Sequence, residues 1–215
     1  MNPQNPHETT PVVATGAVLS DAKAAMIITH GRGDSAENIL MLAREFWRDD
    51  FAYLAPQAAG SSWYPLSFLS PIPQNEPGIT SGLKKLGAVL KSIEDAGISP
   101  EKTVLLGFSQ GACLSLEYAA RNARRYGGVV ALSGGLIGPN GTPRDYEGSL
   151  NETPVFLGCS DVDFHIPVER VHESTAVMKK LGGDVTERIY PGMGHTINSD
   201  EMAFVRDLMQ NLVAD

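Results

Sequence analysis

Cysteine and basic residues are scarce in this 215-residue chain, and long apolar runs are missing. The two cysteines, Cys113 and Cys159, lie in segments that we expect to be buried, which favours reduced thiols over a disulfide. Lysine and arginine number 17 against 25 acidic residues, and the resulting net charge of −8 argues against nucleic acid as a partner. No run approaches the ~18 apolar residues that a membrane span needs, so we expect no integral membrane association.

The start of the chain also lacks the pattern of a signal peptide. Its first six residues, Met-Asn-Pro-Gln-Asn-Pro, are polar and rich in proline. We therefore expect a cytoplasmic protein. Residues 1–11 are predicted to form a flexible N-terminal arm, and residues 12–215 a single domain, since this length supports one sizeable core.

Short apolar runs alternate with amphipathic segments along the chain. Strands are predicted at residues 11–19, 24–29, 51–55, 103–106, 127–133, 154–159 and 185–190, and helices at 36–47, 78–96, 110–122, 168–181 and 200–212. This alternation is typical of an α/β fold with a mostly parallel twisted sheet and helices on both faces. Ligands of such sheets bind beyond the carboxyl ends of the strands, where the glycine-rich turns of this chain lie.

The segment of residues 57–77 is irregular and rich in proline, serine and aromatic residues. A loop of this length is usually functional or disordered, and its aromatic content argues against disorder. Because ligand pockets are mostly apolar, Trp63, Tyr64, Phe68 and Leu69 are candidate walls of a substrate pocket. Ordinary packing of the loop is an equal alternative, and the sequence leaves open whether residues 56–77 form a mobile lid.

A serine stands at the apex of a predicted strand, turn and helix. The sequence Gly-Phe-Ser-Gln-Gly at residues 107–111 follows a run of apolar residues and precedes a helix-forming run. Gly107 and Gly111 lack the Cβ atoms that would collide with the neighbouring strand and helix, and Ser109 lies at a helix N-terminus, which favours negative charge. In this context Gly-x-Ser-x-Gly indicates the nucleophile elbow of an α/β-hydrolase.

A serine nucleophile needs a base within hydrogen-bond reach, and the chain has five histidines. Four are less suitable by position: His7 in the predicted arm, His30 upstream of the nucleophile, His165 beside an aspartate, and His172 inside a helix. His195 follows the last predicted strand in a glycine-bracketed loop, and it completes the chain order Ser…Asp…His of this fold. We therefore predict that His195 is the base.

The orienting acid has two candidates, Asp161 and Asp163, which follow the same predicted strand, and spacing does not decide between them. The oxyanion hole needs two backbone donors. One is the N–H of Gln110, directly after the nucleophile. The other is assigned to the Arg32 N–H, within the glycine-rich turn of residues 30–33.

Three segments together resemble the phospholipase/carboxylesterase family of small α/β-hydrolases, which includes acyl-protein thioesterases. They are His30-Gly31-x-Gly33-Asp34, Gly107-Phe108-Ser109-Gln110-Gly111 and Asp161-x-Asp163-x-x-Ile166-Pro167, followed by Gly194-His195, and the resemblance spans residue 24 to the C-terminus. In that family the second aspartate of the third segment is the triad acid, so the resemblance implies Asp163. Phe164 stands where the family often has proline, which leaves the identity of the acid unchanged.

Arg32 departs from the family, which usually has an apolar residue between these two glycines. Only its backbone N–H is needed for the oxyanion hole. Its side chain is expected to pair with Asp34 or Glu37. The alternative is that it leans toward the pocket and favours an anionic acyl or leaving group.

The sequence thus predicts a serine carboxylesterase that hydrolyses small or medium esters through a Ser-His-Asp triad and an acyl-enzyme, without cofactor or metal. An acyl-protein or acyl-CoA thioesterase and a lysophospholipase with the same triad are alternatives, and a non-catalytic binding module on a hydrolase fold is a further one. A dienelactone-type hydrolase is disfavoured, because such enzymes have a cysteine in the elbow. The expected partner is a small-molecule ester, and the oligomeric state is open, with a homodimer among the options.

Overall fold

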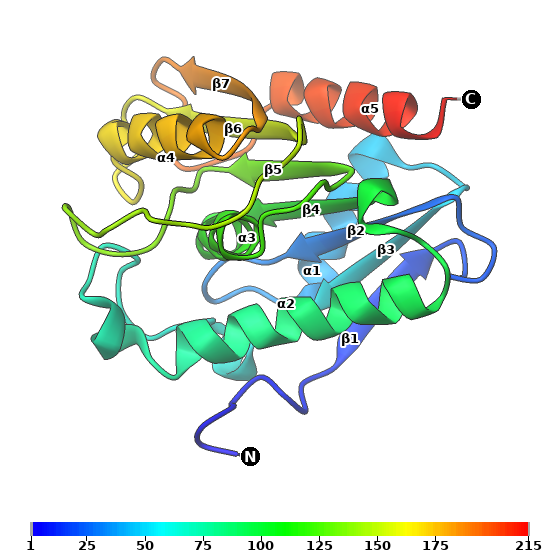
Figure 1. Cartoon of the computed structure of the whole chain (residues 1–215), viewed down its shortest axis with the longest axis horizontal. Coiled ribbons are helices and arrows are strands. Elements are labelled where there is room, and N and C mark those ends of the chain that lie inside the picture. Colours follow the sequence, from blue (N-terminus) through cyan, green and yellow to red (C-terminus); the bar gives the residue numbers. More distant parts are fainter. Residues whose placement is uncertain (1, 215) are drawn as a thin grey trace.

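Residues 2–214, which the computed structural model describes, form a seven-stranded sheet with helices on both faces (Figure 1). The strands are β1 (Val12–Gly16), β2 (Ala24–Thr29), β3 (Phe51–Pro56), β4 (Thr103–Phe108), β5 (Gly128–Leu132), β6 (Pro154–Ser160) and β7 (Asp184–Tyr190). Their order in the sheet is β1-β3-β2-β4-β5-β6-β7, and every neighbouring pair is parallel except β1 with β3. The predicted α/β-hydrolase architecture with a mostly parallel sheet is confirmed.

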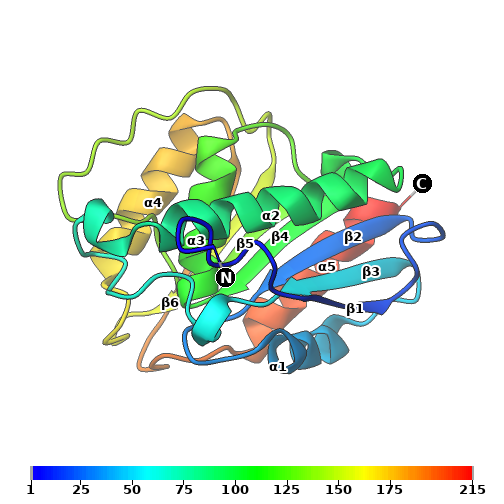
Figure 2. The same cartoon turned by 90° about the horizontal axis from the view of Figure 1, so that it is seen from below.

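Helices cover the two faces of the sheet unequally (Figures 1 and 2). On one face lie α2 (Gly78–Asp95), α3 (Gln110–Arg121) and α4 (Val168–Lys180), and on the other lie α1 (Ala36–Leu40) and α5 (Ser199–Val213). The predicted helix at 36–47 is α-helical only at its start and continues as a 3-10 helix over Met41–Phe46. In that tighter turn Ala43 and Phe46 lie three residues apart and share one buried face.

The central strands contribute side chains to two separate cores. All six residues of β2 are buried. Met26 and Ile28 pack with α1 and α5, whereas Ala25 and Ile27 pack with the helices on the opposite face. A strand buried on both faces has no need for alternating polar residues, which explains the continuous apolar runs of the sequence.

The N-terminal segment is docked against the domain, which corrects the prediction of a flexible arm over residues 1–11. Residues 1 and 215 lie outside the described residues. His7 is only 2% exposed, and its main-chain N–H donates to Ser81 Oγ at 2.9 Å. Its ring Nδ1 accepts from the Ala59 N–H at 3.0 Å, and its Nε2 lies 2.9 Å from the Trp63 carbonyl oxygen. The polar composition of the segment does not predict that His7 is buried against the domain.

We expect His7→Ala to lower the free energy of unfolding by about 2–4 kcal/mol, because it leaves the partly buried N–H of Ala59 and the buried carbonyl of Trp63 without partners. Urea denaturation at pH 7.5 measures this loss. Burial lowers the pKa of His7 below its usual 6.5, so its stabilising contribution is present above pH 6.5 and is lost as the pH falls below it. The difference between wild type and variant should therefore shrink in acid. Thr9→Ala, at an exposed position of the same segment, is the control; equal midpoints for both variants would contradict the docking.

Candidate active site

Ser109 occupies the sharp turn between the end of β4 and the start of α3, with a φ of +55° that is strained for any residue other than glycine. The turn fits only because its flanking residues are small. A Cβ on Gly107 would lie 2.3 Å from the Gly111 carbonyl oxygen, and a Cβ on Gly111 would lie 2.1 Å from the Thr29 carbonyl oxygen. Both distances are far below van der Waals contact, so the two glycines are a steric requirement of this crossing.

Ser109, His195 and Asp163 form a continuous hydrogen-bonded chain. His195 Nε2 lies 2.8 Å from Ser109 Oγ, and His195 Nδ1 lies 2.7 Å from Asp163 Oδ2. These residues follow β4, β7 and β6 respectively, and the carboxyl ends of these parallel strands meet at one edge of the sheet. Because a carboxylate faces Nδ1, that nitrogen carries the proton, and Nε2 is left to accept the proton of the serine.

The Asp163 side chain is fully buried beneath His195. Its Oδ1 accepts hydrogen bonds from the main-chain N–H groups of His165 at 2.8 Å and Ile166 at 3.1 Å. Burial raises the pKa of the Asp163 carboxyl, but the hydrogen bonds from His195 and from these two amides outweigh it and hold the pKa below its usual value. The group is therefore ionised at neutral pH. Asp161, the other candidate, is exposed and accepts from the Gly192 N–H at 2.8 Å, which closes the loop that carries His195.

The other histidines lie outside this hydrogen-bonded chain. His30 is buried and its Nε2 accepts from the Ala58 N–H at 3.0 Å, while His172 pairs with Glu187 at 2.8 Å. His165 lies nearest, with its ring 4.7 Å from that of His195 in an edge-on arrangement.

The backbone donors predicted for an oxyanion hole come from two elements that meet at Ser109. Gln110 is the first residue of α3, so its N–H has no acceptor within the helix. The turn that carries Arg32 runs alongside the serine, because a Cβ on the preceding Gly31 would lie 3.4 Å from Ser109 Cβ. Negative charge that develops beside Ser109 would therefore face the positive end of the α3 dipole.

A cavity of about 670 Å³ opens beside Ser109 and His195. Tyr64 and Phe68, two of the four residues proposed as walls of a substrate pocket, line it. Trp63 and Leu69 are not among its lining residues, and their assignment to the wall is corrected. Trp63 is completely buried and its indole N–H donates to the His30 carbonyl at 2.9 Å, while Leu69 packs against the main core.

Three other apolar residues of the cavity lining were not predicted from the sequence. Phe108 and Ile166 also line the cavity, although both stand within the motifs that marked the site. Cys113 lies one helical turn after the nucleophile and contributes to the lining as well. Burial raises the pKa of its thiol to about 12, so it stays protonated and is no rival nucleophile. Both cysteines are free and buried, as predicted.

The side chains of Gln110, from the elbow, and of Asn75, from the loop itself, hold the pocket loop in place. Gln110 Oε1 accepts from the Trp63 N–H at 2.9 Å, and its Nε2 donates to the Tyr64 carbonyl at 2.8 Å. Farther along the loop, the buried Asn75 accepts from the Leu66 N–H and donates to the Ser67 carbonyl, both at 2.8 Å. The backbone of the wall is therefore tied down at both ends, which is the arrangement of a fixed wall.

The Arg32 side chain also holds the pocket loop through hydrogen bonds. Its guanidinium donates to Ser62 Oγ at 2.9 Å and to the carbonyl oxygens of Pro65 at 2.8 Å and Leu66 at 2.6 Å. The predicted pairing with Asp34 or Glu37 is corrected, since the Asp34 carboxylate accepts instead from the Ser35 N–H and from Asn38. The long-range contact of Arg32 with a loop thirty residues away has no signal in the local sequence.

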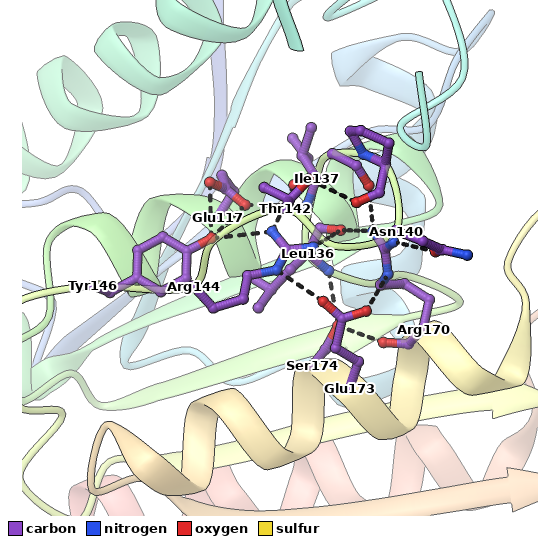
Figure 3. Close-up of polar contacts among 12 residues, drawn as sticks. Glu117, Leu136, Ile137, Asn140, Thr142, Arg144, Tyr146, Arg170, Glu173 and Ser174 are labelled. Atoms are coloured by element: carbon purple, nitrogen blue, oxygen red, sulfur yellow. Dashed lines mark hydrogen bonds and ion pairs between the residues drawn. The ribbon is translucent and has the colours of Figure 1, made fainter. Parts of the chain in front are cut away.

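A buried polar network supports the far side of the pocket (Figure 3). Arg170 of α4 is 2% exposed and donates to the carbonyl oxygens of Leu136 at 2.8 Å and Gly138 at 2.6 Å. The Gly138 N–H in turn donates to the Phe68 carbonyl at 2.7 Å, and the guanidinium carbon of Arg170 lies 5.8 Å from the centre of the Phe68 ring. Glu173 pairs with Arg170 and with Arg144 of the same network, each at 2.9 Å.

Residues 2–214 contain neither a cluster of metal-binding side chains nor a helix suited to span a membrane. In this part of the chain no three or more histidine, cysteine or acidic side chains gather as metal ligands would. Likewise, none of the described helices combines the length and apolar character of a membrane span.

Comparisons with known proteins agree with this geometry. A family model described as Phospholipase/Carboxylesterase matches residues 10–213. Acyl-protein thioesterase 1 of Gibberella zeae is 30% identical over 87% of this chain and 91% of that protein, and its Kluyveromyces lactis namesake is 30% identical over 93% and 95%. A crystal structure of a phospholipase/carboxylesterase from Dyadobacter fermentans has 42% identity and a TM-score of 0.90, covering 94% of this chain and 96% of that one. The chain therefore belongs to the phospholipase/carboxylesterase family of serine hydrolases that act on ester bonds.

Proposed function

We propose that this protein is a carboxylesterase that hydrolyses small or medium carboxylic esters through an acyl-enzyme on Ser109. The observation that carries the proposal is the chain of contacts from Ser109 Oγ through His195 to Asp163, at 2.8 and 2.7 Å. It supplies a nucleophile, a base and an orienting acid in hydrogen-bond contact before any substrate binds. The adjacent cavity gives the ester a place to lie.

In the acylation step, Ser109 Oγ attacks the ester carbonyl carbon while His195 Nε2 takes the hydroxyl proton. The ionised Asp163 stabilises the imidazolium that forms. The oxygen of the tetrahedral intermediate takes up the negative charge and accepts hydrogen bonds from the N–H groups of Gln110 and Arg32. Collapse of the intermediate breaks the bond to the leaving alkoxide, which receives the proton from His195.

Deacylation repeats these steps with water as the nucleophile. His195, neutral again, removes a proton from a water molecule that attacks the acyl-enzyme carbonyl. The second tetrahedral intermediate uses the same two N–H groups, and its collapse returns the proton from His195 to Ser109 Oγ. The products are a carboxylic acid and an alcohol, and the enzyme is restored without a cofactor.

Thioester hydrolysis is the alternative, since the same residues serve a thiolate leaving group and the Gibberella zeae and Kluyveromyces lactis relatives are named acyl-protein thioesterases. One observation favours an ester over a thioester, and a second favours a short or medium acyl group. The Dyadobacter fermentans relative, which has the higher identity of 42%, is described as a phospholipase/carboxylesterase. In addition, the pocket wall is bounded by Phe68, whose ring and carbonyl are both held by the Arg170 network.

We propose accordingly that Arg170 is a positioning residue for this wall. Arg170 touches neither Ser109 nor His195 in the contacts described above, and it holds Phe68 through the ring and through Gly138. Without the guanidinium, Phe68 loses two of its constraints while the hydrogen-bonded chain of Ser109 keeps all of its own. The fit of the acyl group should change, and the chemistry should not.

We expect Ser109→Ala to lower kcat/KM for p-nitrophenyl butyrate by at least about 10⁴-fold, because no other group can form the acyl-enzyme. The variant should keep the melting temperature of the wild type and should no longer react with a fluorophosphonate probe. Ser20→Ala, at an exposed serine, is the control and should retain full activity and labelling. Retained turnover in the Ser109 variant would end the proposal.

We expect wild type to prefer the butyrate over the palmitate ester of p-nitrophenol, and Arg170→Met to reduce that preference by about tenfold through KM while kcat for the acetate ester stays unchanged. Arg144→Met is the matched control. Arg144 shares Glu173 and the Leu136 carbonyl with Arg170, but none of its contacts within residues 2–214 involves Phe68 or Gly138, so this variant should keep the preference of the wild type. Steady-state kinetics over the ester series and matching thioesters measures both effects. An unchanged preference in Arg170→Met would refute the positioning role, and a preference of wild type for palmitoyl thioesters would favour the thioesterase alternative.

A further inference from the structure

A second cavity, of about 550 Å³, lies between α2, the β1 edge of the sheet and the N-terminal segment. It shares no lining residue with the catalytic cavity. The N-terminal segment passes below α2 on its way to β1 in Figure 1, and in front of α2 in Figure 2. Volumes of about 300–1,000 Å³ are typical of sites for small molecules, so the size alone permits a ligand.

The floor of this groove is apolar. Val12 and Ala14 alternate along β1 and share a face with Leu54, which pairs with Ala14 in the antiparallel register. Ala88 and Val89 of α2 line the same cavity. Val12 is 39% exposed, because α2 leaves the outermost strand of the sheet uncovered. A concave apolar surface of this kind favours the alkyl chain of a ligand.

Lys85, whose ammonium is partly buried, lies at one wall of the groove. Lys85 is 8% exposed, and its Nζ donates to the main-chain carbonyls of Glu8, at 3.5 Å, and Thr10. An ammonium has three N–H donors, so at least one remains for a further acceptor. Burial lowers the pKa of Lys85, and no charged group among the described residues offsets this effect of burial.

The charge of Lys85 has no anionic partner within residues 2–214: none of the ion pairs described for them includes it. Buried charges in proteins are normally paired, because an uncompensated one is costly. Lys84 adds a second positive charge to the lining. The one acidic residue of the lining, Glu8, is exposed, and its carboxylate lies 3.5 Å from Asn2 Nδ2.

We propose that this groove is a binding site for an amphipathic monocarboxylate of medium chain length. Its carboxylate pairs with the Lys85 ammonium, and its alkyl chain lies along Val12, Ala14 and Leu54. The ligand supplies the missing counter-charge and covers the exposed apolar floor at the same time. A neutral amphiphile can satisfy only the second requirement, and a cationic one is repelled by the two lysines.

The test is an NMR titration of the whole ¹⁵N-labelled protein with decanoate, decanol and decyltrimethylammonium, because amide shifts report where each probe binds. Decanoate should cause saturable shifts in β1 and in residues 84–92 of α2. Decanol and decyltrimethylammonium should bind there at least about tenfold more weakly, since neither completes the ion pair. Shifts by decanoate that are confined to the surroundings of Ser109, or equal affinities for decanoate and decanol, would overturn the proposal.

Two variants locate the interaction further. Lys85→Met should weaken decanoate binding by about tenfold or more, whereas Lys91→Met, in the same helix but exposed and paired with Asp95, should not. Lys85 also holds the N-terminal segment, so Ala14→Asp provides a second test that leaves this contact intact and places a like charge on the floor. Decanoate binding that survives either Lys85→Met or Ala14→Asp unchanged would refute the site.

Discussion

The close approach of α3 to the strands beneath it is the constraint on which the rest of this active site depends. The first turn of α3 lies so near β2 and β4 that neither Gly107 nor Gly111 has room for a Cβ atom. That closeness forces Ser109 into a positive φ and thereby lifts its hydroxyl from the end of the strand toward His195. The strain is local, and it is compensated by the burial of nearly every residue of α3 and β4 around it.

The same turn organises the pocket. Gln110 follows Ser109 as the first residue of α3, so its backbone N–H has no acceptor within the helix, while its side chain holds the backbone of Trp63 and Tyr64. Arg32 has a similar double role, since its turn runs beside Ser109 and its guanidinium binds the Pro65 and Leu66 carbonyls. The two donors of the proposed oxyanion hole are therefore also the residues that fix the pocket wall. Displacement of the backbone at residues 63–66 would therefore disturb the reaction centre directly, whereas Phe68 is held separately by the Arg170 network.

The parts of the fold and site that the sequence predicted are those set by local chemistry. Apolar runs locate the buried strands, and the spacing of Gly107, Ser109 and Gly111 locates the elbow. The position of His195 after the last strand followed from the chain order of the fold, whereas Asp163 needed the family resemblance. The structure adds a physical reason for that choice, because Asp163 is buried beneath His195 while Asp161 is exposed at a loop.

The errors concern contacts between residues far apart in the chain. Trp63 and Tyr64 are neighbours in an aromatic loop, yet one reaches into the core and the other lines the cavity. His7 lies in a polar segment that composition marks as flexible, but its ring forms two hydrogen bonds with residues more than fifty positions away. Composition and periodicity describe a residue with its near neighbours, so they carry no information about such partners.

The most direct measurement of the central claim is an acid quench of the enzyme during turnover of p-nitrophenyl butyrate, followed by mass spectrometry of the intact protein and its peptides. We expect one butyryl group per chain, attached to Ser109, and its disappearance when the substrate is exhausted. Turnover with no acyl group on the protein, or with the acyl group on another residue such as Cys113, would contradict the account.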